Sequence, residues 1–391
     1  MAYYRQVGEV PHKRHTQFRR PDGGLYAEEL VGADGFSSDS ALLYHRHPPT
    51  AIVAAEAVDE PDPGLAPNRP LLPRHFRTHQ IEAGSRGDGS LTRRVLLGNS
   101  DVRLTYAVVT EPGPLYRNAV GDEVLYVESG SGRVETGYGV LEVSAGDYVV
   151  LPTSTTHRVV PGAEPLRLLG IEATGHIGPP RRYLSAKGQF LEHAPYCERD
   201  LRGPTEPFQV DGQDVEVLVR STQGLTRYTY AEHPFDVVGW DGCLYPYAVS
   251  IHDFEPITGR IHQPPPVHQM FEGPNLVICS FVPRLFDYHP LSIPAPYSHA
   301  NVDSDEVLFY CGGEFMSRKG AGIEQGSISL HPSGFTHGPQ PGSVEASIGA
   351  RSTEELAVMV DTFRPLWLGD SARDSEDAGY PWTWSGRGPA G

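Results

Sequence analysis

The chain has few cysteines and a shortage of positive charge. Its four cysteines (Cys197, Cys243, Cys279 and Cys311) show no paired spacing, which excludes a disulfide framework and fits a reducing compartment. The 32 Lys and Arg residues are outnumbered by 49 Asp and Glu residues, and the net charge is -17. Nucleic-acid binding needs concentrated positive surface, so this balance argues against nucleic-acid partners.

Long apolar runs and helical heptads are also missing. No segment reaches membrane-spanning length and the N-terminus lacks a signal-peptide core, so we expect a soluble, cytoplasmic protein with no membrane partner. What the chain has in abundance is glycine and proline, 43 and 36 residues. That content is typical of a β-rich protein with many loops.

One pattern occurs twice, about 180 residues apart. Each copy contains an asparagine, a glutamate before an apolar run, a glycine five residues before a proline, and a final histidine. The first copy comprises Tyr116, Asn118, Glu123, Gly146, Pro152 and His157. The second comprises His299, Asn301, Glu306, Gly326, Pro332 and His337. The copies differ chiefly at their first position, where Tyr116 stands in place of His299.

Short runs within each copy alternate apolar and polar residues between Gly and Pro, so they predict strands. These runs are Glu306 to Tyr310, Ser327 to Leu330 and Asp147 to Leu151. The first hundred or so residues show little periodicity by comparison. We therefore predict an all-β-dominated fold with two barrels in one chain. The predicted domains are residues 1–255, holding a metal-free barrel, and residues 256–391, holding a barrel with a metal site and the tail.

The second copy carries a complete set of metal ligands. His299, Glu306 and His337 supply two imidazoles and one carboxylate, the ligand set associated with Fe(II) oxygenases that keep coordination positions open. In the first copy a neutral phenol, a poor ligand for Fe(II), replaces the first imidazole at Tyr116. We predict one Fe(II) per chain and a vestigial position at His157.

These residues also carry a resemblance. The forms H-x-N-x4-E from His299 and G-x5-P-x-G-x2-H from Gly326 resemble the two motifs of the cupin superfamily, whose jelly-roll barrels occur singly or in pairs. In the first copy Ser154 replaces the turn glycine. Most of the chain also resembles the homogentisate 1,2-dioxygenase family, notably in residues 25–30, 233–242, 296–301 and 329–339.

The resemblance implies a bicupin enzyme that opens the ring of homogentisate (2,5-dihydroxyphenylacetate) with O2 to give maleylacetoacetate, in tyrosine and phenylalanine catabolism. It also implies a homo-oligomer, a trimer or hexamer. One alternative is a dioxygenase of the same fold that acts on another hydroquinone or hydroxylated aromatic acid. Others are a metal-dependent cupin isomerase and a non-enzymatic binding module, and the intact triad argues against the binding module.

Further site residues follow from the same resemblance. His262 aligns best with a pocket histidine that acts as acid and base. His268 is the alternative, because the prolines between the two histidines allow either of them to align with that position. His331 matches a second pocket histidine that either contacts substrate or orients a ligand. Tyr297 is a candidate to present its hydroxyl to the substrate. Phe315 stands where the family usually has a tyrosine, which motivates the alternative substrates.

Overall fold

A computed structural model describes residues 3–60, 62–83, 93–313, 315 and 321–387. Strands dominate this part of the chain, and its α-helices are the short segments α1 (Ser343–Ser347) and α2 (Asp370–Asp374). The prediction of an all-β-dominated fold is confirmed. Within the described residues, no helix combines the length and the apolar character needed to cross a membrane.

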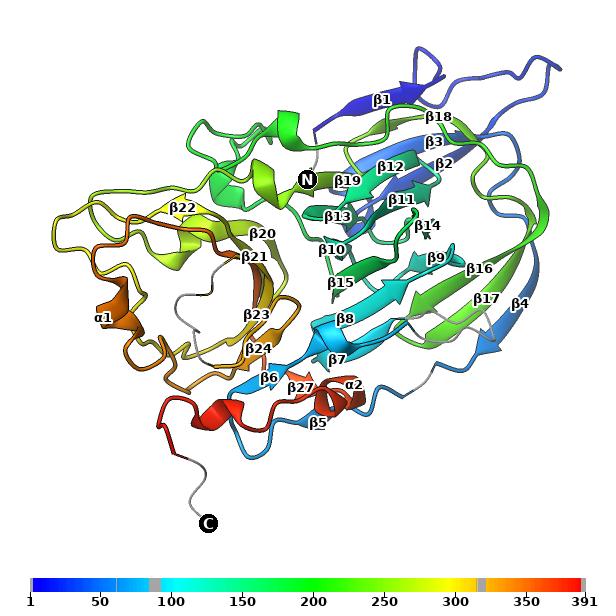
Figure 1. Ribbon diagram of the computed structural model, residues 1–391. Helices are drawn as coiled ribbons and strands as arrows, with labels where there is room; N and C mark the ends of the chain where they lie inside the picture. The colour runs from blue at the N-terminus through cyan, green and yellow to red at the C-terminus, as the bar shows by residue number, and fades with distance from the viewer. Residues whose placement is uncertain (1–2, 61, 84–92, 314, 316–320, 388–391) are drawn as a thin grey trace. The chain divides into compact units, whose positions relative to one another are not determined.

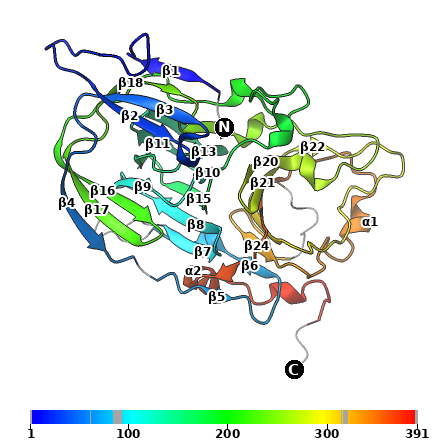
Figure 2. The same cartoon turned by 180° about the vertical axis from the view of Figure 1, so that it is seen from behind.

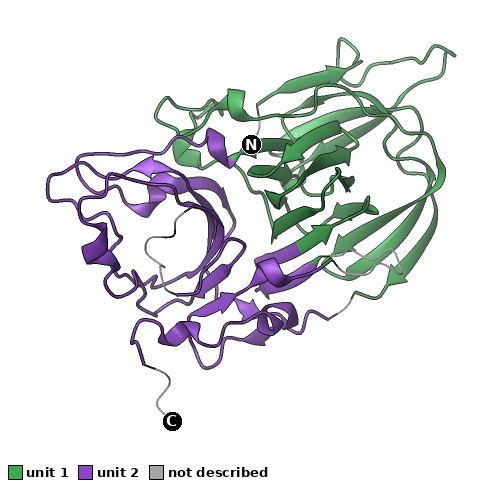
Figure 3. Ribbon diagram, viewed as in Figure 1, with its two compact units in different colours: residues 1–61, 83–93, 107–250 green, residues 62–82, 94–106, 251–391 purple. Residues whose placement is uncertain are grey.

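By its internal contacts the chain groups into two compact units (Figure 3). Unit 1 comprises Met1–Pro61, Ala83–Arg93 and Ala107–Ser250, and unit 2 comprises Asp62–Glu82, Arg94–Tyr106 and Ile251–Gly391. This grouping places two N-terminal segments with the C-terminal part of the chain. The contiguous division at residue 255 stays a prediction.

Unit 1 is built from three groups of hydrogen-bonded strands. The first has the order β1 (Arg5–Gly8), β18 (Val237–Gly242), β3 (Ser40–His45), β2 (Ala27–Gly32). The second has the order β12 (Gly139–Ser144), β11 (Ser131–Thr136), β14 (His157–Pro161), β9 (Leu115–Asn118), β16 (Gln213–Ser221), β17 (Gly224–Glu232), β4 (Ile52–Val58). The third has the order β19 (Tyr247–Ser250), β13 (Asp147–Leu151), β10 (Glu123–Ser129), β15 (Leu166–Ala173). Figures 1 and 2 show β16, β17 and β4 side by side.

The predicted run from Asp147 to Leu151 coincides with β13 and is confirmed. Alternate residues of β10 and β13 form the core of the first barrel, because Leu125 and Val127 pack with Val149 and Leu151. All four side chains are nearly fully buried. The alternation that predicted strands therefore also selects the face that the barrel buries.

Unit 2 contains the second barrel. Its main sheet has the order β20 (Gln269–Gly273), β21 (Leu276–Phe281), β26 (Leu356–Thr362), β23 (Asp305–Gly312), β24 (Ile328–His331), β6 (Arg74–Phe76). A small pair consists of β22 (Arg284–Leu285) and β25 (Ser352–Thr353). The predicted runs from Glu306 to Tyr310 and from Ser327 to Leu330 correspond to β23 and β24.

The two N-terminal segments of unit 2 add strands that the sequence did not reveal. β6 pairs with β24, and β7 (Arg94–Gly98) pairs with β8 (Val102–Val109) and with β27 (Trp367–Leu368). β27 also pairs with β5 (Ala66–Pro67). The weak periodicity of the first hundred residues therefore does not exclude strands there. β5, β6 and β27 are only two or three residues long, and β5 and β6 pair with segments far along the chain, so local periodicity cannot detect them.

The same turn precedes the last histidine of each motif copy. The Ser154 amide donates to the Asn118 carbonyl at 2.7 Å, and the Gly334 amide donates to the Asn301 carbonyl at 2.8 Å. Ser154 and Gly334 both adopt positive φ, 66° and 76°. Glycine is the residue that tolerates this region most easily, so Ser154 retains the turn of the repeat at some steric cost.

A buried histidine with two carboxylate partners lies in unit 1. His45, at the end of β3, is 3% exposed. Its Nδ1 is 2.6 Å from Asp236 Oδ1 and its Nε2 is 2.9 Å from Glu29 Oε2. Burial lowers the pKa of His45, but the two carboxylates outweigh burial and raise the pKa to about 9. The folded state therefore favours the imidazolium.

The stability contributed by this cluster should depend on pH. A histidine whose pKa rises on folding stabilises fully below its unfolded pKa, and this stabilisation disappears as the pH passes the folded pKa. His45→Gln should lower the free energy of unfolding by roughly 3 kcal/mol near pH 6 and much less above about pH 10. Denaturant titrations at both pH values measure the difference, with the exposed His193→Gln as control. An equal loss at both pH values contradicts the prediction.

Candidate metal centre

Glu306 is held by the central strand of the second barrel. It is the second residue of β23, paired with His331 of β24 on one side and with Asp361 of β26 on the other. Strand alternation directs Glu306, Leu308 and Tyr310 to one face of the sheet. Leu308 and Tyr310 belong to the hydrophobic cluster of the barrel. The sheet thus presents the carboxylate of Glu306 on the same face as buried apolar side chains.

The two predicted histidine ligands are joined through their backbones. The His299 amide donates to the His337 carbonyl at 2.8 Å, and the His337 amide donates to the His299 carbonyl at 2.9 Å. The Nδ1 atoms lie 3.3 Å from the Tyr297 carbonyl oxygen and 3.2 Å from the Phe335 carbonyl oxygen. A ring nitrogen held by a carbonyl carries the proton, which leaves Nε2 as the metal-binding nitrogen.

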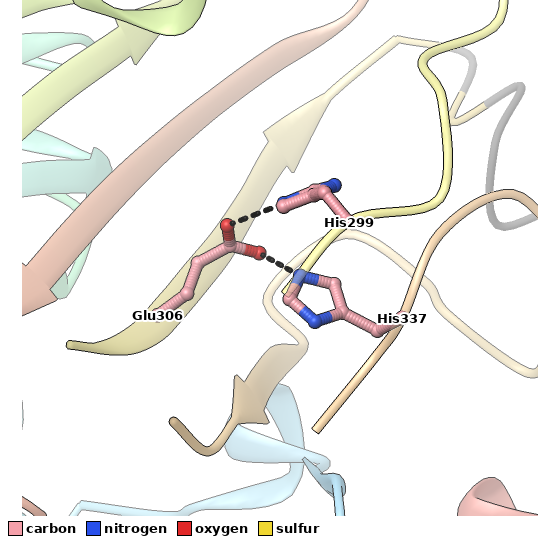
Figure 4. A group of neighbouring side chains, drawn as sticks. All are labelled: His299, Glu306 and His337. Atoms are coloured by element: carbon pink, nitrogen blue, oxygen red, sulfur yellow. Dashed lines mark hydrogen bonds and ion pairs between the residues drawn. The ribbon is translucent and has the colours of Figure 1, made fainter. Parts of the chain in front are cut away.

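Both Nε2 atoms face the Glu306 carboxylate (Figure 4). His299 Nε2 is 3.4 Å from Oε2, and His337 Nε2 is 3.2 Å from Oε1. The ligand atoms of the three residues all lie within 4.8 Å of one another. Donors bound at right angles to one metal at about 2.1 Å are separated by about 3 Å. The structure therefore brings the three predicted ligands together with a spacing that fits a metal ion.

The charges around Glu306 also fit a cation. Burial raises the pKa of Glu306, but hydrogen bonds with His299, His331 and His337 outweigh burial and hold the pKa well below its usual range. Burial and the adjacent Glu306 raise the pKa of Asp361 to about 8. Asp361 Oδ1 is buried and has no hydrogen-bond partner among the described residues. Two neighbouring acids with one unsatisfied oxygen suit a site that holds a positive ion.

His331 contacts the predicted ligands themselves. Its side chain is fully buried, its Nδ1 is 2.9 Å from Glu306 Oε1, and its Nε2 is 3.0 Å from Tyr380 Oη. Its ring stacks on His337 with the centroids 4.1 Å apart. Of the two predicted roles, these contacts fit the orientation of a ligand, and substrate contact by His331 remains a prediction.

The candidate acid and base residues have different surroundings. His262 is half-exposed, with Nδ1 3.2 Å from Asp287 Oδ2, and its ring meets Tyr297 at 5.2 Å. Tyr297 in turn lies 6.3 Å from the His299 ring. His268 is buried against Phe281, and burial, with a smaller effect of Arg284, lowers its pKa to about 3. The structure thus connects His262, and not His268, with the metal ligands through Tyr297.

Phe315 lies over the apolar part of the barrel. Its ring packs edge-on against Tyr310 at 4.8 Å between centroids. Tyr310 bonds to Ser329 through its hydroxyl at 3.0 Å, so this phenol is already engaged. Phe315 therefore adds an apolar surface near the face of β23 that carries Glu306.

Two residues of this site were missed by the sequence reasoning. Asp361 is equivalent to Glu172 of unit 1, because Glu123 pairs with Glu172 as Glu306 pairs with Asp361, but this equivalence is seen only in the strand pairing and not in the sequence motifs. Tyr380 had no signal either, since it belongs to the C-terminal tail. Trp384 fixes that tail by donating its indole N–H to the Gly338 carbonyl at 3.0 Å.

Comparisons with known proteins give a domain match and two groups of relatives. The model described as "Cupin domain" matches residues 104–172. A protein named "putative dioxygenase" from Saccharolobus solfataricus is 39% identical over 388 residues, 98% of this chain and 99% of its own. Homogentisate 1,2-dioxygenase from Rhodopseudomonas palustris is 25% identical over 390 residues, 92% of this chain and 85% of its own. A cupin 2 conserved barrel domain protein from Leptotrichia buccalis is a distant structural neighbour, with 9% identity over 74% of this chain and 96% of its own and a TM-score of 0.32.

The similarity to the two named dioxygenases extends over both motif copies. The Saccharolobus relative matches from end to end at an identity that shows common family membership. The family-model match covers the first copy, from before Tyr116 to Glu172. The chain therefore belongs to the same family of cupin-domain proteins as this Saccharolobus relative, and it is more distantly similar to the homogentisate 1,2-dioxygenases.

Proposed function

We propose that the chain is an Fe(II)-dependent dioxygenase that opens the aromatic ring of homogentisate with O2 to give maleylacetoacetate. The observation that carries the proposal is the convergence of His299 Nε2, His337 Nε2 and one Glu306 carboxylate in unit 2. Two imidazoles and a carboxylate are typical of Fe(II) oxygenases. The dioxygenase names of the relatives point in the same direction.

Fe(II) held by these ligands supplies Lewis acidity and redox chemistry at the coordination positions that they leave open. The chain itself holds the ligands and moves a proton. His331 and Tyr380 fix the orientation of Glu306 through hydrogen bonds of 2.9 and 3.0 Å. We assign to His262 the role of accepting a phenolic proton and returning it, and the contact of its imidazole with Tyr297, which lies beside His299, supports this assignment.

A second candidate is a dioxygenase of the same fold that acts on another hydroquinone or hydroxylated aromatic acid. Phe315 favours it, because a phenylalanine cannot give a hydrogen bond to a polar substrate group. A cupin isomerase is the remaining alternative. Oxygen-electrode assays with Fe(II) and a panel of dihydroxylated aromatics test all three, since an isomerase consumes no O2.

We also propose that the chain forms a homo-oligomer, a trimer or hexamer. Unit 2 exposes several large apolar side chains, among them Leu291 and Val302, which are 83% and 84% exposed. Burial of such side chains against another subunit would remove their apolar surface from water.

The metal-ligand assignment predicts a matched loss of iron and activity. His299→Ala, Glu306→Ala or His337→Ala should each abolish turnover and reduce iron from about one per chain towards zero, with circular dichroism unchanged. The exposed His252→Ala is the control and should retain both. A ligand variant with near-normal iron and rate would refute the assignment.

His262→Ala should separate chemistry from metal binding. As a general acid and base, His262 should contribute roughly 100-fold to kcat, so the variant should be that much slower with iron content retained. His268→Ala, run in parallel, should change kcat far less, because a buried imidazole with a pKa of about 3 stays neutral and cannot take the proton. Loss of iron in His262→Ala would mean that this residue holds the metal or the fold.

Phe315→Tyr should change substrate preference. A new hydroxyl that reaches a polar substrate group is worth on the order of 1 kcal/mol, or about fivefold in kcat/KM for homogentisate. Steady-state kinetics across the hydroquinone panel measure the ratio of kcat/KM between substrates. Phe363→Tyr, at an exposed position, is the control for a hydroxyl added elsewhere. Identical constants for wild type and Phe315→Tyr would show that residue 315 does not touch the substrate.

A further inference from the structure

An arginine lies in the first barrel among the residues that match the metal ligands of the second. Arg93 Nη1 is 2.6 Å from Glu123 Oε1 and 3.4 Å from Glu172 Oε1. The guanidinium carbon lies 4.8 Å from the centre of the Tyr116 ring. The Arg93 side chain is 13% exposed, and both carboxylates are more buried still. A guanidinium in this setting is a fixed, permanently charged cation.

Strand register shows that these are equivalent positions. Tyr116 pairs with His157 across an antiparallel bridge, as His299 pairs with His337. Each glutamate also has an acidic neighbour on the adjacent strand, Glu172 beside Glu123 and Asp361 beside Glu306. The final histidine is held alike in both barrels, because His157 Nδ1 lies 3.0 Å from the Thr155 carbonyl oxygen. Arg93 therefore binds the carboxylate that corresponds to a metal ligand.

The electrostatics of the first barrel explain why a cation is present. Burial raises the pKa of Glu123, but Arg93, followed by His157, outweighs burial and lowers the pKa below its usual range. Glu172 is shared with Arg220, whose Nη1 lies 2.5 Å from Oε2. Buried carboxylates without a counter-ion are strongly disfavoured, so two of them next to each other require positive partners.

One imidazole nitrogen in this place is left without a partner. His157 Nε2 is buried and has no hydrogen-bond partner among the described residues. His157 and Tyr116 line a small cavity together with Arg93. In the second barrel the corresponding imidazole nitrogen, His337 Nε2, faces Glu306 as a candidate ligand. The first barrel thus keeps the imidazole nitrogen that corresponds to a candidate ligand, while Arg93 pairs with the carboxylate that corresponds to another.

We propose that the Arg93 guanidinium takes the electrostatic place of a metal ion in the first barrel. Replacing Arg93 with an uncharged residue, together with Tyr116→His, opens a second site for a divalent transition metal. The site would use His157, Glu123 and the substituted position 116 as ligands. Imidazole and carboxylate ligands of this kind bind first-row divalent ions.

The first test concerns charge. Arg93→Met should lower the melting temperature, because it leaves Glu123 and Glu172 short of positive charge. Adding Glu123→Gln to Arg93→Met should recover part of the loss, and Arg93→Lys should lose less than Arg93→Met. Arg133→Met is the control and should change little, because Arg133 is more exposed than Arg93 and its partner Glu135 keeps a second ion pair with Arg158. A melting temperature for Arg93→Met equal to that of wild type, or no recovery with Glu123→Gln, overturns the role of Arg93.

The second test counts metal. After loading with Co(II), the Arg93→Met/Tyr116→His variant should hold about two cobalt ions per chain, against about one in wild type, and Co(II) should raise its melting temperature more. Adding Glu306→Ala should bring the count back to about one, because the second barrel is then emptied. A double variant that folds but holds the wild-type amount of cobalt overturns the proposal, as does one that fails to fold with and without Co(II).

Discussion

The structure depends on a buried carboxylate in the central strand of each barrel and on the positive partner that this carboxylate requires. Glu123 and Glu306 are 1% and 6% exposed, and each has a second acid on the neighbouring strand. A buried charge is tolerated only when it is paired or coordinates a metal. In the first barrel the partner is a guanidinium. In the second barrel imidazoles surround Glu306, and Asp361 keeps an oxygen unsatisfied.

The scaffold that holds these carboxylates is the same in both barrels, down to single hydrogen bonds. The residue before each glutamate is an aspartate that accepts two backbone amides from separate segments. Asp305 accepts from Ser333 and Leu366, both at 2.8 Å, and Asp122 accepts from Thr153 at 2.8 Å and Ile177 at 2.9 Å. These aspartates tie the central strand to the turn before the last histidine. The carboxylate and the histidine therefore keep their relative positions even where the ligand set has changed.

The sequence predicted the parts of this arrangement that are encoded locally. Strand alternation, the turn at Gly334 and the spacing from His299 to His337 were sufficient to identify the fold class and to group three ligands that the structure brings together. The contributions of β6, Arg93 and Tyr380 were not predictable. Each is defined by a partner far along the chain, and a single sequence carries no signal for such pairs when the segment itself is short or irregular.

The residue opposite each glutamate shows how the two barrels diverged. Glu306 pairs with His331, whereas Glu123 pairs with Leu151. A carboxylate that gives one oxygen to a metal needs a hydrogen bond to hold the rest of the group, and His331, fixed by Tyr380, supplies it. A carboxylate already held by Arg93 needs no such donor, so an apolar leucine that packs into the core replaces the imidazole. The positive partner of each carboxylate, Arg93 in the first barrel and the imidazoles in the second, thus goes together with the polarity of the side chains around it. The difference at these few positions distinguishes the barrel with a candidate metal site from the barrel without one.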